Sequence, residues 1–450
     1  VQVCAGSLSI NEGSAVTVTG DAVEKTENDG AIQDGAAISI VNRTGYKGLG
    51  TVTVSGGKFT AKKGNSAIKA YNWENNTESK FTAREKVAVS GGTFSSEVSE
   101  DLCAEGFIPT KNADDTYGVK AGKYVAQIGN VKYETLAEAI AAAKDGDTVK
   151  LLDDVDLTET LIIRDKTITL DLNGKTISNS TDIWNESTYS WSLISVRDNG
   201  DLTIDDTVGG GTLKAKENDC FTLDVYAYDT KNVENTRLTV NAGNYIGNIS
   251  AVYAFTGKVT INGGHFSIQQ KESGSDPYRL TLNCYDSSYT AGRAGFTVNG
   301  GMFENFDPRN NLAEGAGTSF VAEGVGIDKN ADGTFTAKSG MAAQIVDADG
   351  NSVAAYAGHY DAIKAAKDGE TVILLSDRKN FVTNTVNANI TIDLNGKTLS
   401  VGNNNPFFRT NGEVTIQNGT IDSQEACVIV NAYNKLTLKN VKITGVTGNN

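Results

Sequence analysis

The sequence is poor in proline, histidine and tryptophan, with 4 Pro, 2 His and 3 Trp among its 450 residues. It also lacks an excess of positive charge. The formal net charge is −15, and no cluster of Lys and Arg marks a face that could follow a phosphate backbone, so we expect no nucleic-acid partner. No apolar run approaches the roughly 18 residues that a membrane span requires, so we expect no membrane insertion.

Cysteine is also scarce, and its spacing argues against chemistry. No two cysteines have the C-x-x-C spacing of a zinc site or a redox motif, and an odd number gives no complete disulfide framework. We therefore expect the thiols to pack as small apolar side chains and expect no cofactor. The cysteines are Cys4, Cys103, Cys220, Cys284 and Cys427.

Glycine, by contrast, is abundant, with 48 residues, and much of it lies in a recurring unit. In each unit, alternating β-branched residues precede a Gly pair or its equivalent, a variable residue follows, and an apolar residue comes next. This pattern predicts short strands joined by sharp turns, repeated at the spacing of a solenoid. The units are TVTVSGGKF at 51–59, VAVSGGTF at 87–94, LTVNAGNY at 238–245, VTINGGHF at 259–266, FTVNGGMF at 296–303 and VTIQNGTI at 414–421.

A longer repeat relates residues 135–176 to residues 358–398, and both copies end in DLNGKT. Each copy predicts a short amphipathic helix followed by strands. In the first copy, Thr135 and Glu138 have the spacing of a capping box, and Gly146 is where we expect a left-handed C-cap. We interpret each helix as a cap over the open end of a stack of strands.

A third repeat suggests the division into units. AEGFIPTKNADDTYGVKAG at 104–122 is matched by AEGVGIDKNADGTFTAKSG at 322–340, and both precede a predicted capping helix. We therefore predict three units: the C-terminal part of a first unit at 1–122, a complete second unit at 123–340, and the N-terminal part of a third at 341–450. Because both chain ends fall inside strand-and-turn patterns, we expect a fragment of a longer protein.

Together, the Gly-Gly units and the repeated helices and DLNGKT segments resemble the parallel β-helix modules of large surface proteins from Gram-positive gut bacteria. The helix-then-strand opening is also similar to that of pectate-lyase-like β-helices. The resemblance implies an all-β fold, a right-handed parallel β-helix solenoid in consecutive units, each opened by a short capping α-helix. It also implies a bacterial cell-surface or secreted protein that contacts host or dietary macromolecules.

Parallel β-helices also carry enzymes that act on acidic sugars, and such enzymes require convergent carboxylates. The nearest candidate is Asp205-Asp206, but the third unit has Gln417-Asn418 at the matching position, which favours a turn role. The Gly-His-Gly signature of polygalacturonases is absent. For His265 and His359 the pattern favours surface or packing roles. We therefore assign no catalytic residue.

Three acidic segments superficially resemble calcium loops: KNADD at 111–115, KNADG at 329–333 and VDADGNS at 346–352. None has the length and the final glutamate of an EF-hand loop. We predict Asx turns at these places and no metal site.

Long insertions indicate where a ligand could bind. The complete unit inserts NSTDIWNESTYSW at 179–191, where the third unit has the shorter VGNNNP at 401–406, and it inserts a second loop after Tyr228. Aromatic loops on a rigid solenoid suit the recognition of glycans or proteins, although the rings could instead fold back and become buried. The predicted ligand-binding residues are Trp184, Tyr189, Trp191, Tyr228, Tyr278, Tyr285, Tyr289 and Trp73.

The leading hypothesis is therefore a non-enzymatic, adhesin-like binding module for a host glycan or glycoprotein, with mucin and immunoglobulin as candidates. Two alternatives stay open. The first is a polysaccharide lyase or glycosidase on the same scaffold, and the second is a passive surface stalk.

Overall fold

The structure is a computed structural model that describes residues 1–23, 33–43, 45–75, 77–270, 280–311, 314–315, 317–381, 384–401, 408–423 and 430–445. These residues are mostly β-strand with a few short helices, so the chain is an all-β protein. They form two compact units, Val1–Tyr124 and Val125–Asn450. The predicted boundary between residues 340 and 341 falls inside the second unit and stays a prediction. Within the described ranges, no helix is long and apolar enough to cross a membrane.

The first compact unit is built on parallel strand pairs. Its central strand β5 (Leu49–Thr60) pairs in parallel with β2 (Gly6–Ile10) and β8 (Val87–Phe94), so two Gly-Gly units lie side by side. The rings of Phe59 and Phe94, which follow the variable position of each unit, stack with 5.1 Å between centres. The other elements are β1 (Gln2–Val3), β3 (Ala15–Thr17), β4 (Ile38–Arg43), β6 (Ile68–Glu74), β7 (Thr77–Ser79), η1 (Ala83–Glu85), η2 (Glu100–Leu102), β9 (Phe107–Lys111) and β10 (Tyr117–Ala121).

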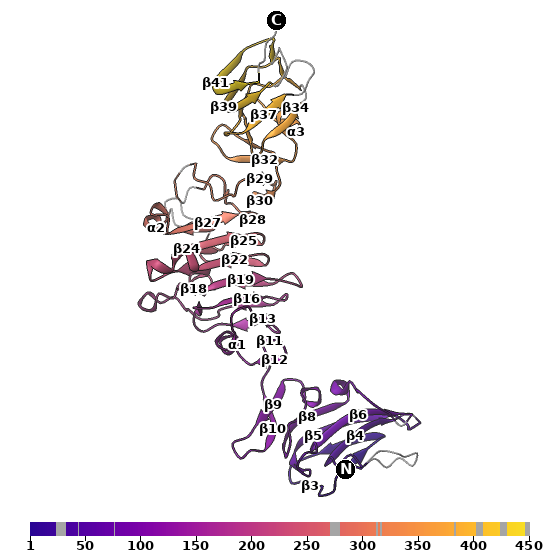
Figure 1. Cartoon of the computed structure of the whole chain (residues 1–450). Helices are drawn as coiled ribbons and strands as arrows, with labels where there is room; N and C mark the ends of the chain where they lie inside the picture. The colour runs from indigo at the N-terminus through magenta and orange to yellow at the C-terminus, as the bar shows by residue number, and fades with distance from the viewer. Residues whose placement is uncertain are drawn as a thin grey trace. The chain divides into compact units, whose positions relative to one another are not determined.

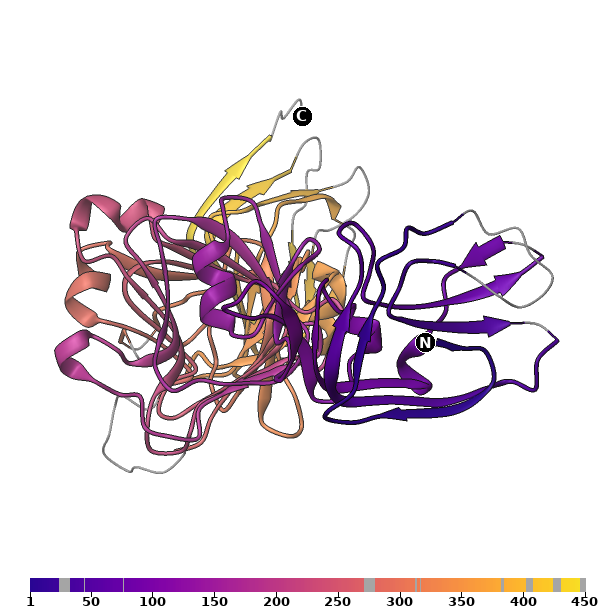
Figure 2. The ribbon, with the colours of Figure 1, turned by 90° about the horizontal axis from the view of Figure 1, so that it is seen from below.

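The second unit opens with β11 (Ala126–Ile128), β12 (Val131–Tyr133) and α1 (Leu136–Ala142) and then forms three parallel ladders that the chain visits in turn. The first ladder holds β13 (Thr148–Leu151), β16 (Thr167–Asp171), β19 (Asp201–Asp205), β22 (Arg237–Val240), the second half of β24 (Val252–Ile261) and β27 (Ala294–Val298). The second holds β14 (Val155–Asp156), β17 (Thr176–Ser178), β20 (Thr212–Lys214), β23 (Asn244–Gly247), β25 (His265–Ile268) and β28 (Gly301–Glu304). The third holds β15 (Leu161–Arg164), β18 (Ser192–Arg197), β21 (Phe221–Tyr226), the first half of β24 and β26 (Leu282–Cys284). Strands of the first ladder follow one another along this unit in Figure 1, and Figure 2 looks along the same direction.

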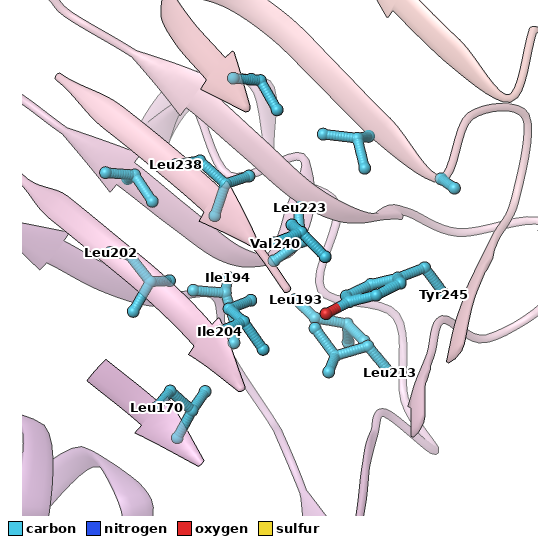
Figure 3. Close-up of a cluster of buried hydrophobic side chains, with 14 of the residues drawn as sticks. Leu170, Leu193, Ile194, Leu202, Ile204, Leu213, Leu223, Leu238, Val240 and Tyr245 are labelled. Carbon is cyan, nitrogen blue, oxygen red and sulfur yellow. The ribbon is translucent and has the colours of Figure 1, made fainter. Parts of the chain in front are cut away.

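The core of residues 125–337 lies between the three ladders, and a separate cluster of buried side chains forms the core of residues 343–421. Strand residues at alternate positions point inward, and the parallel register places equivalent residues above one another. In the first ladder, Leu170 pairs with Ile204, and Ile204 pairs with Val240. Figure 3 shows these side chains together with Leu223 from the third ladder and Tyr245 from the second, all of them buried.

The second ladder contributes an aromatic column to this core. Phe266 stacks on Tyr245 and on Phe303, with ring centres 4.8 Å and 5.2 Å apart and 11° between planes in both pairs. All three rings follow the Gly pair, or its equivalent, of a repeated unit and are buried. The repeat therefore supplies a continuous column of side chains along the unit.

The capping box predicted for α1 is confirmed. The Thr135 hydroxyl accepts a bond from the Glu138 amide at 3.1 Å, and the Glu138 carboxylate accepts one from the Thr135 amide at 3.2 Å. Gly146 has the predicted left-handed backbone, with φ of 86°, but it is not the C-cap, because α1 ends at Ala142 and its C-cap Ala143 is extended. The ammonium group of Lys166 donates to the carbonyls of Ile140 and Ala143, at 2.8 Å and 3.1 Å, so this helix end is satisfied by a distant residue.

The remainder of the second unit repeats the opening pattern. The hairpin of β29 (Val325–Lys329) and β30 (Thr334–Ser339) precedes β31 (Ala343–Val346), β32 (Ser352–Tyr356) and α3 (His359–Ala365). His359 is buried, and its Nε2 lies 2.9 Å from the Ser376 carbonyl oxygen, so the predicted packing role is confirmed. The following strands are β33 (Thr371–Leu374), β34 (Arg378–Phe381), β35 (Asn384–Val386), β36 (Ile390–Asp393), β37 (Thr398–Val401), β38 (Phe408–Thr410), β39 (Val414–Asp422), β40 (Val430–Ala432) and β41 (Leu436–Thr444).

Candidate functional site

A continuous group of aromatic rings covers the outer side of the third ladder in the second unit. It contains most of the predicted ligand-binding residues and several more from the strands beneath them. We call this group the aromatic surface. Its members are Trp184, Tyr189, Trp191, Phe221, Tyr226, Tyr228, Tyr253, Phe255 and Tyr285.

Phe255 occupies the centre of the aromatic surface. Its ring is stacked on Tyr285, with 4.5 Å between centres and 8° between planes, and lies 5.3 Å from Trp191 and 4.9 Å from Tyr226. A contact of 6.3 Å with Tyr253 joins it to a second row of rings. In that second row, ring centres lie 5.0 Å apart between Tyr253 and Phe221 and 5.5 Å apart between Phe221 and Trp184.

Many of these rings remain accessible. The exposed fractions are 40% for Trp184, 43% for Tyr189, 67% for Tyr228 and 43% for Tyr285. The interpretation that the loop rings fold back and become buried therefore does not hold for these four. Trp191 is half-buried between Tyr189 and Phe255. Exposed aromatic rings that support one another form a rigid contact area with little side-chain entropy to lose on binding.

The strand pattern explains how β24 contributes to this surface. Val252 and Ala254 point into the core and are fully buried, so Tyr253 and Phe255 project outward and are half-buried. In β21, Leu223 and Val225 point inward, and Tyr226 projects outward in the same way. These residues lie on strands and not in the loop insertions, so the sequence prediction did not include them. The alternation in VYAF at 252–255 was the signal that could have found them.

A groove of about 220 Å³ opens between the rings. Its walls are aromatic, and its polar side chains are those of Ser250 and Asn283, with no charged side chain among the lining residues. Ser250 is fully buried, and its hydroxyl oxygen has no hydrogen-bond partner among the described residues. The lining residues are Trp184, Trp191, Phe221, Ile249, Ser250, Tyr253, Phe255 and Asn283.

The 179–191 loop is held at both ends by buried charged side chains. At its start, the Asp219 carboxylate accepts bonds from the Asn179 side chain at 2.7 Å and from the Ile183 and Trp184 amides at 3.0 Å and 3.1 Å. At its end, the Arg197 guanidinium donates to the Tyr189 carbonyl at 2.6 Å. Bonds to a charged partner are stronger than neutral ones, so Trp184 and Tyr189 are positioned before any ligand arrives.

Asp224 lies in β21 beneath the rings and is fully buried. Its carboxylate accepts a bond from the Ser195 hydroxyl at 2.9 Å and another from the Ser192 hydroxyl. Burial raises the pKa of Asp224 to about 6, against the lowering effects of these two hydroxyls and of Arg197. Arg197 also donates to Ser195 at 3.0 Å, so the buried network connects Asp224 to the loop anchor.

The other predicted residues are placed elsewhere. Trp73, in β6 of the first compact unit, is 5% exposed and packs with Val41 and Tyr71, so the binding role assigned to it is replaced by a core role. Tyr289, in α2 (Asp286–Thr290), lies 6.1 Å from Phe320 and packs against the core. Tyr278 lies outside the described residues, as do most of the 401–406 segment and Cys427.

The acidic candidates have structural roles. The Asp206 carboxylate accepts bonds from the Gly174 and Gly211 amides, both at 2.7 Å, and Asp205 accepts one from Asn241 at 2.7 Å. The predicted turn role is confirmed for Asp206, whereas Asp205 is the last residue of β19.

The predicted Asx turns are confirmed as well. Asp114 accepts from the Thr116 amide at 3.2 Å, Asp332 from the Thr334 amide at 3.0 Å and Asp347 from the Asp349 amide at 3.0 Å. Within the described ranges, no group of three or more His, Cys, Asp or Glu side chains could hold a metal ion.

A larger cavity of about 970 Å³ lies near Arg309 and Lys397. Two acidic residues, Glu323 and Asp349, line the same cavity, and Glu323 pairs with Lys397. Since both signs of charge are present and aromatic rings are absent from its lining, this cavity shows no preference for a ligand class. The groove in the aromatic surface is the better candidate, although it is smaller.

Comparisons of the chain with protein-family models, with curated proteins and with solved structures find no match.

Proposed function

We propose that the chain is part of a bacterial cell-surface or secreted protein, and that it acts as a non-enzymatic binding module for a host glycan or glycoprotein, including mucin or immunoglobulin. The observation that carries the proposal is the aromatic surface. Its rings come from separate loops and strands, yet they form one connected and accessible area. Aromatic faces of this kind match the apolar faces of sugar rings and the hot spots of protein interfaces.

The proposed architecture is a right-handed parallel β-helix in consecutive units. Three parallel ladders visited in turn, with in-register columns of buried side chains, support it. The right hand follows the general preference of crossover connections between parallel strands. A solenoid of this kind is rigid and presents its long loops on one flank, which suits a binding surface.

A binding role is favoured over catalysis by the chemistry of the site. Hydrolysis or elimination of a glycosidic bond requires an acid and a base that converge on the substrate. No Asp, Glu, His, Lys or Arg side chain is among the residues that line the groove. The Asp224 carboxyl group, whose pKa burial raises, is fully enclosed and bonded to Ser192 and Ser195.

The test is a binding array of mammalian glycans, mucins and immunoglobulins, run beside assays for new reducing ends and for unsaturated uronate. The matched variants are Tyr228→Ala, inside the aromatic surface, and Tyr433→Ala, outside it, because the two side chains are 67% and 73% exposed. We expect saturable binding that Tyr228→Ala weakens by about fivefold, corresponding to about 1 kcal/mol, and that Tyr433→Ala leaves unchanged. Product formation would favour the lyase or glycosidase alternative. Absence of both binding and product would favour a passive stalk.

A further inference from the structure

The groove in the aromatic surface differs from the rest of that surface because a polar group lies at its inner end. Trp184, Trp191, Phe221, Tyr253 and Phe255 give it aromatic walls. Asn283, which pairs with Tyr253 in the third ladder, and Ser250, in the turn before β24, are its polar side chains. A ligand group that enters the groove therefore meets apolar rings first and hydrogen-bonding groups further in.

The Ser250 hydroxyl is unsatisfied in the free protein. It is fully buried and has no partner among the described residues, whereas the neighbouring Thr222 hydroxyl donates to the Ala251 carbonyl at 2.5 Å. Buried hydroxyl groups are normally bonded, since leaving one unpaired is costly. A ligand that displaces the atoms covering Ser250 and accepts a hydrogen bond from it would remove that cost on binding.

From this arrangement we propose that the groove is a subsite for an uncharged N-acetylated sugar, with the acetamido group directed toward Ser250. This inference rests on the proposed glycan-binding function and specifies its ligand class. The acetamido carbonyl accepts the Ser250 hydrogen, and its methyl group contacts the aromatic walls. The pyranose ring then lies against the exposed rings at the mouth of the groove.

The lining residues argue against charged sugars. No Lys or Arg lines the groove to meet a carboxylate or a sulfate, so a sialic acid or a sulfated sugar would leave its charge unpaired there. Asp219 and Asp224 are buried carboxylates close in sequence to the lining residue Phe221. Asp219 already accepts hydrogen bonds from the 179–191 loop, and Asp224 accepts them from Ser192 and Ser195.

The lining residues also favour an acetamido group over a hydroxyl group. A sugar hydroxyl placed in the groove could form a hydrogen bond with Ser250. Its other donor and acceptor sites would then lose water to the aromatic walls without gaining a partner. An acetamido group offers one strong acceptor for the serine and a methyl group for the rings. Apolar walls beside the unpartnered Ser250 hydroxyl fit that combination.

The test compares two oligosaccharides that differ only at C2, triacetylchitotriose and cellotriose, by titration calorimetry with the full chain. The corresponding galacto pair is N-acetylgalactosamine and galactose. We expect the wild-type chain to prefer an N-acetylated member by at least tenfold, and Ser250→Ala to reduce that preference about fivefold or more. Trp184→Ala should weaken both members of the bound pair, because it removes a wall of the groove.

The outcomes separate this inference from the function on which it rests. Glycan binding on the array that depends on Tyr228, without an N-acetyl preference or with a preference unchanged in Ser250→Ala, overturns the subsite and leaves the binding function intact. Absence of all glycan binding overturns both. Displacement of a bound sugar by an apolar peptide, with no N-acetyl preference, would reassign the groove to a protein ligand and also overturns the subsite.

Discussion

The ring of Phe255 stacks on the ring of Tyr285 with 4.5 Å between centres, and its centre lies 5.3 Å from that of Trp191. One strand residue therefore connects the loop that precedes β18 to the segment that follows β26. Because Phe255 comes from the third ladder and not from a loop, the aromatic surface is attached directly to the strands. The parallel pairing of β24 with β21 and β26 holds it in place.

We expect Phe255→Ala to abolish detectable glycan or glycoprotein binding and to lower the free energy of unfolding of the second unit by about 2 kcal/mol. This cost is smaller than that for a fully buried phenylalanine because Phe255 is half-buried. Phe255→Leu retains most of the side-chain volume, so it should restore more of the stability than of the binding. Chemical denaturation and the array measure the two effects. Full binding by Phe255→Ala would contradict a central role for this ring.

Asp219 should act as the anchor of the 179–191 loop. Asp219→Ala removes acceptors for two backbone amides and one side chain, at 2.7 Å to 3.1 Å, and we expect faster proteolysis within the loop and a stability loss of about 2 kcal/mol. Asp182→Ala is the matched control in the same loop, because that carboxylate pairs with Lys216 at the surface. If both variants are cleaved at the same rate, the anchoring role is wrong.

The pH dependence of stability should carry a contribution from Asp224. Its folded-state pKa is about 6, above the unfolded value of about 3.9, so the folded state binds more protons between these values. The stabilising contribution is complete below pH about 4 and is lost as the pH rises through 6, with a total on the order of 3 kcal/mol. The measurement is the free energy of unfolding from pH 3.5 to 7.5 for the wild type and for Asp224→Asn. The difference between the two should decline with rising pH, and a flat difference would refute this assignment.

The aromatic column of the core offers a test of the repeat itself. Phe266 is fully buried between Tyr245 and Phe303, and Phe266→Ala should lower the free energy of unfolding by about 4 kcal/mol. His265→Ala, at the preceding outward position, is the neighbouring control and should cost much less. Equal losses for the two variants would show that the column does not support the fold.

The sequence correctly predicted features that depend on neighbouring residues. Its predictions were wrong where contacts between distant residues determine the structure. The capping box of Thr135 and Glu138 is local, and it forms as predicted. The end of the same helix depends on Lys166, which lies beyond the next strands, so the position of Gly146 was misleading. Trp73 and Trp184 both occur in polar segments, yet one is 5% and the other 40% exposed. Only the three-dimensional arrangement determines which ring is covered, here Trp73 by Val41 and Tyr71.

Ser250→Ala should have opposite effects on stability and on recognition. In the free protein the Ser250 hydroxyl is fully buried without a partner, so replacing it by a methyl-bearing side chain removes an unpaired polar group and should raise the free energy of unfolding by about 1 kcal/mol. Thr222→Ala is the contrasting control. Thr222 is also fully buried, but its hydroxyl donates to the Ala251 carbonyl at 2.5 Å, and its removal should be destabilising. Thermal or chemical denaturation without ligand distinguishes the two. A loss of stability in Ser250→Ala would mean that the hydroxyl is already satisfied in the free protein, which would remove the reason for a ligand to bind it.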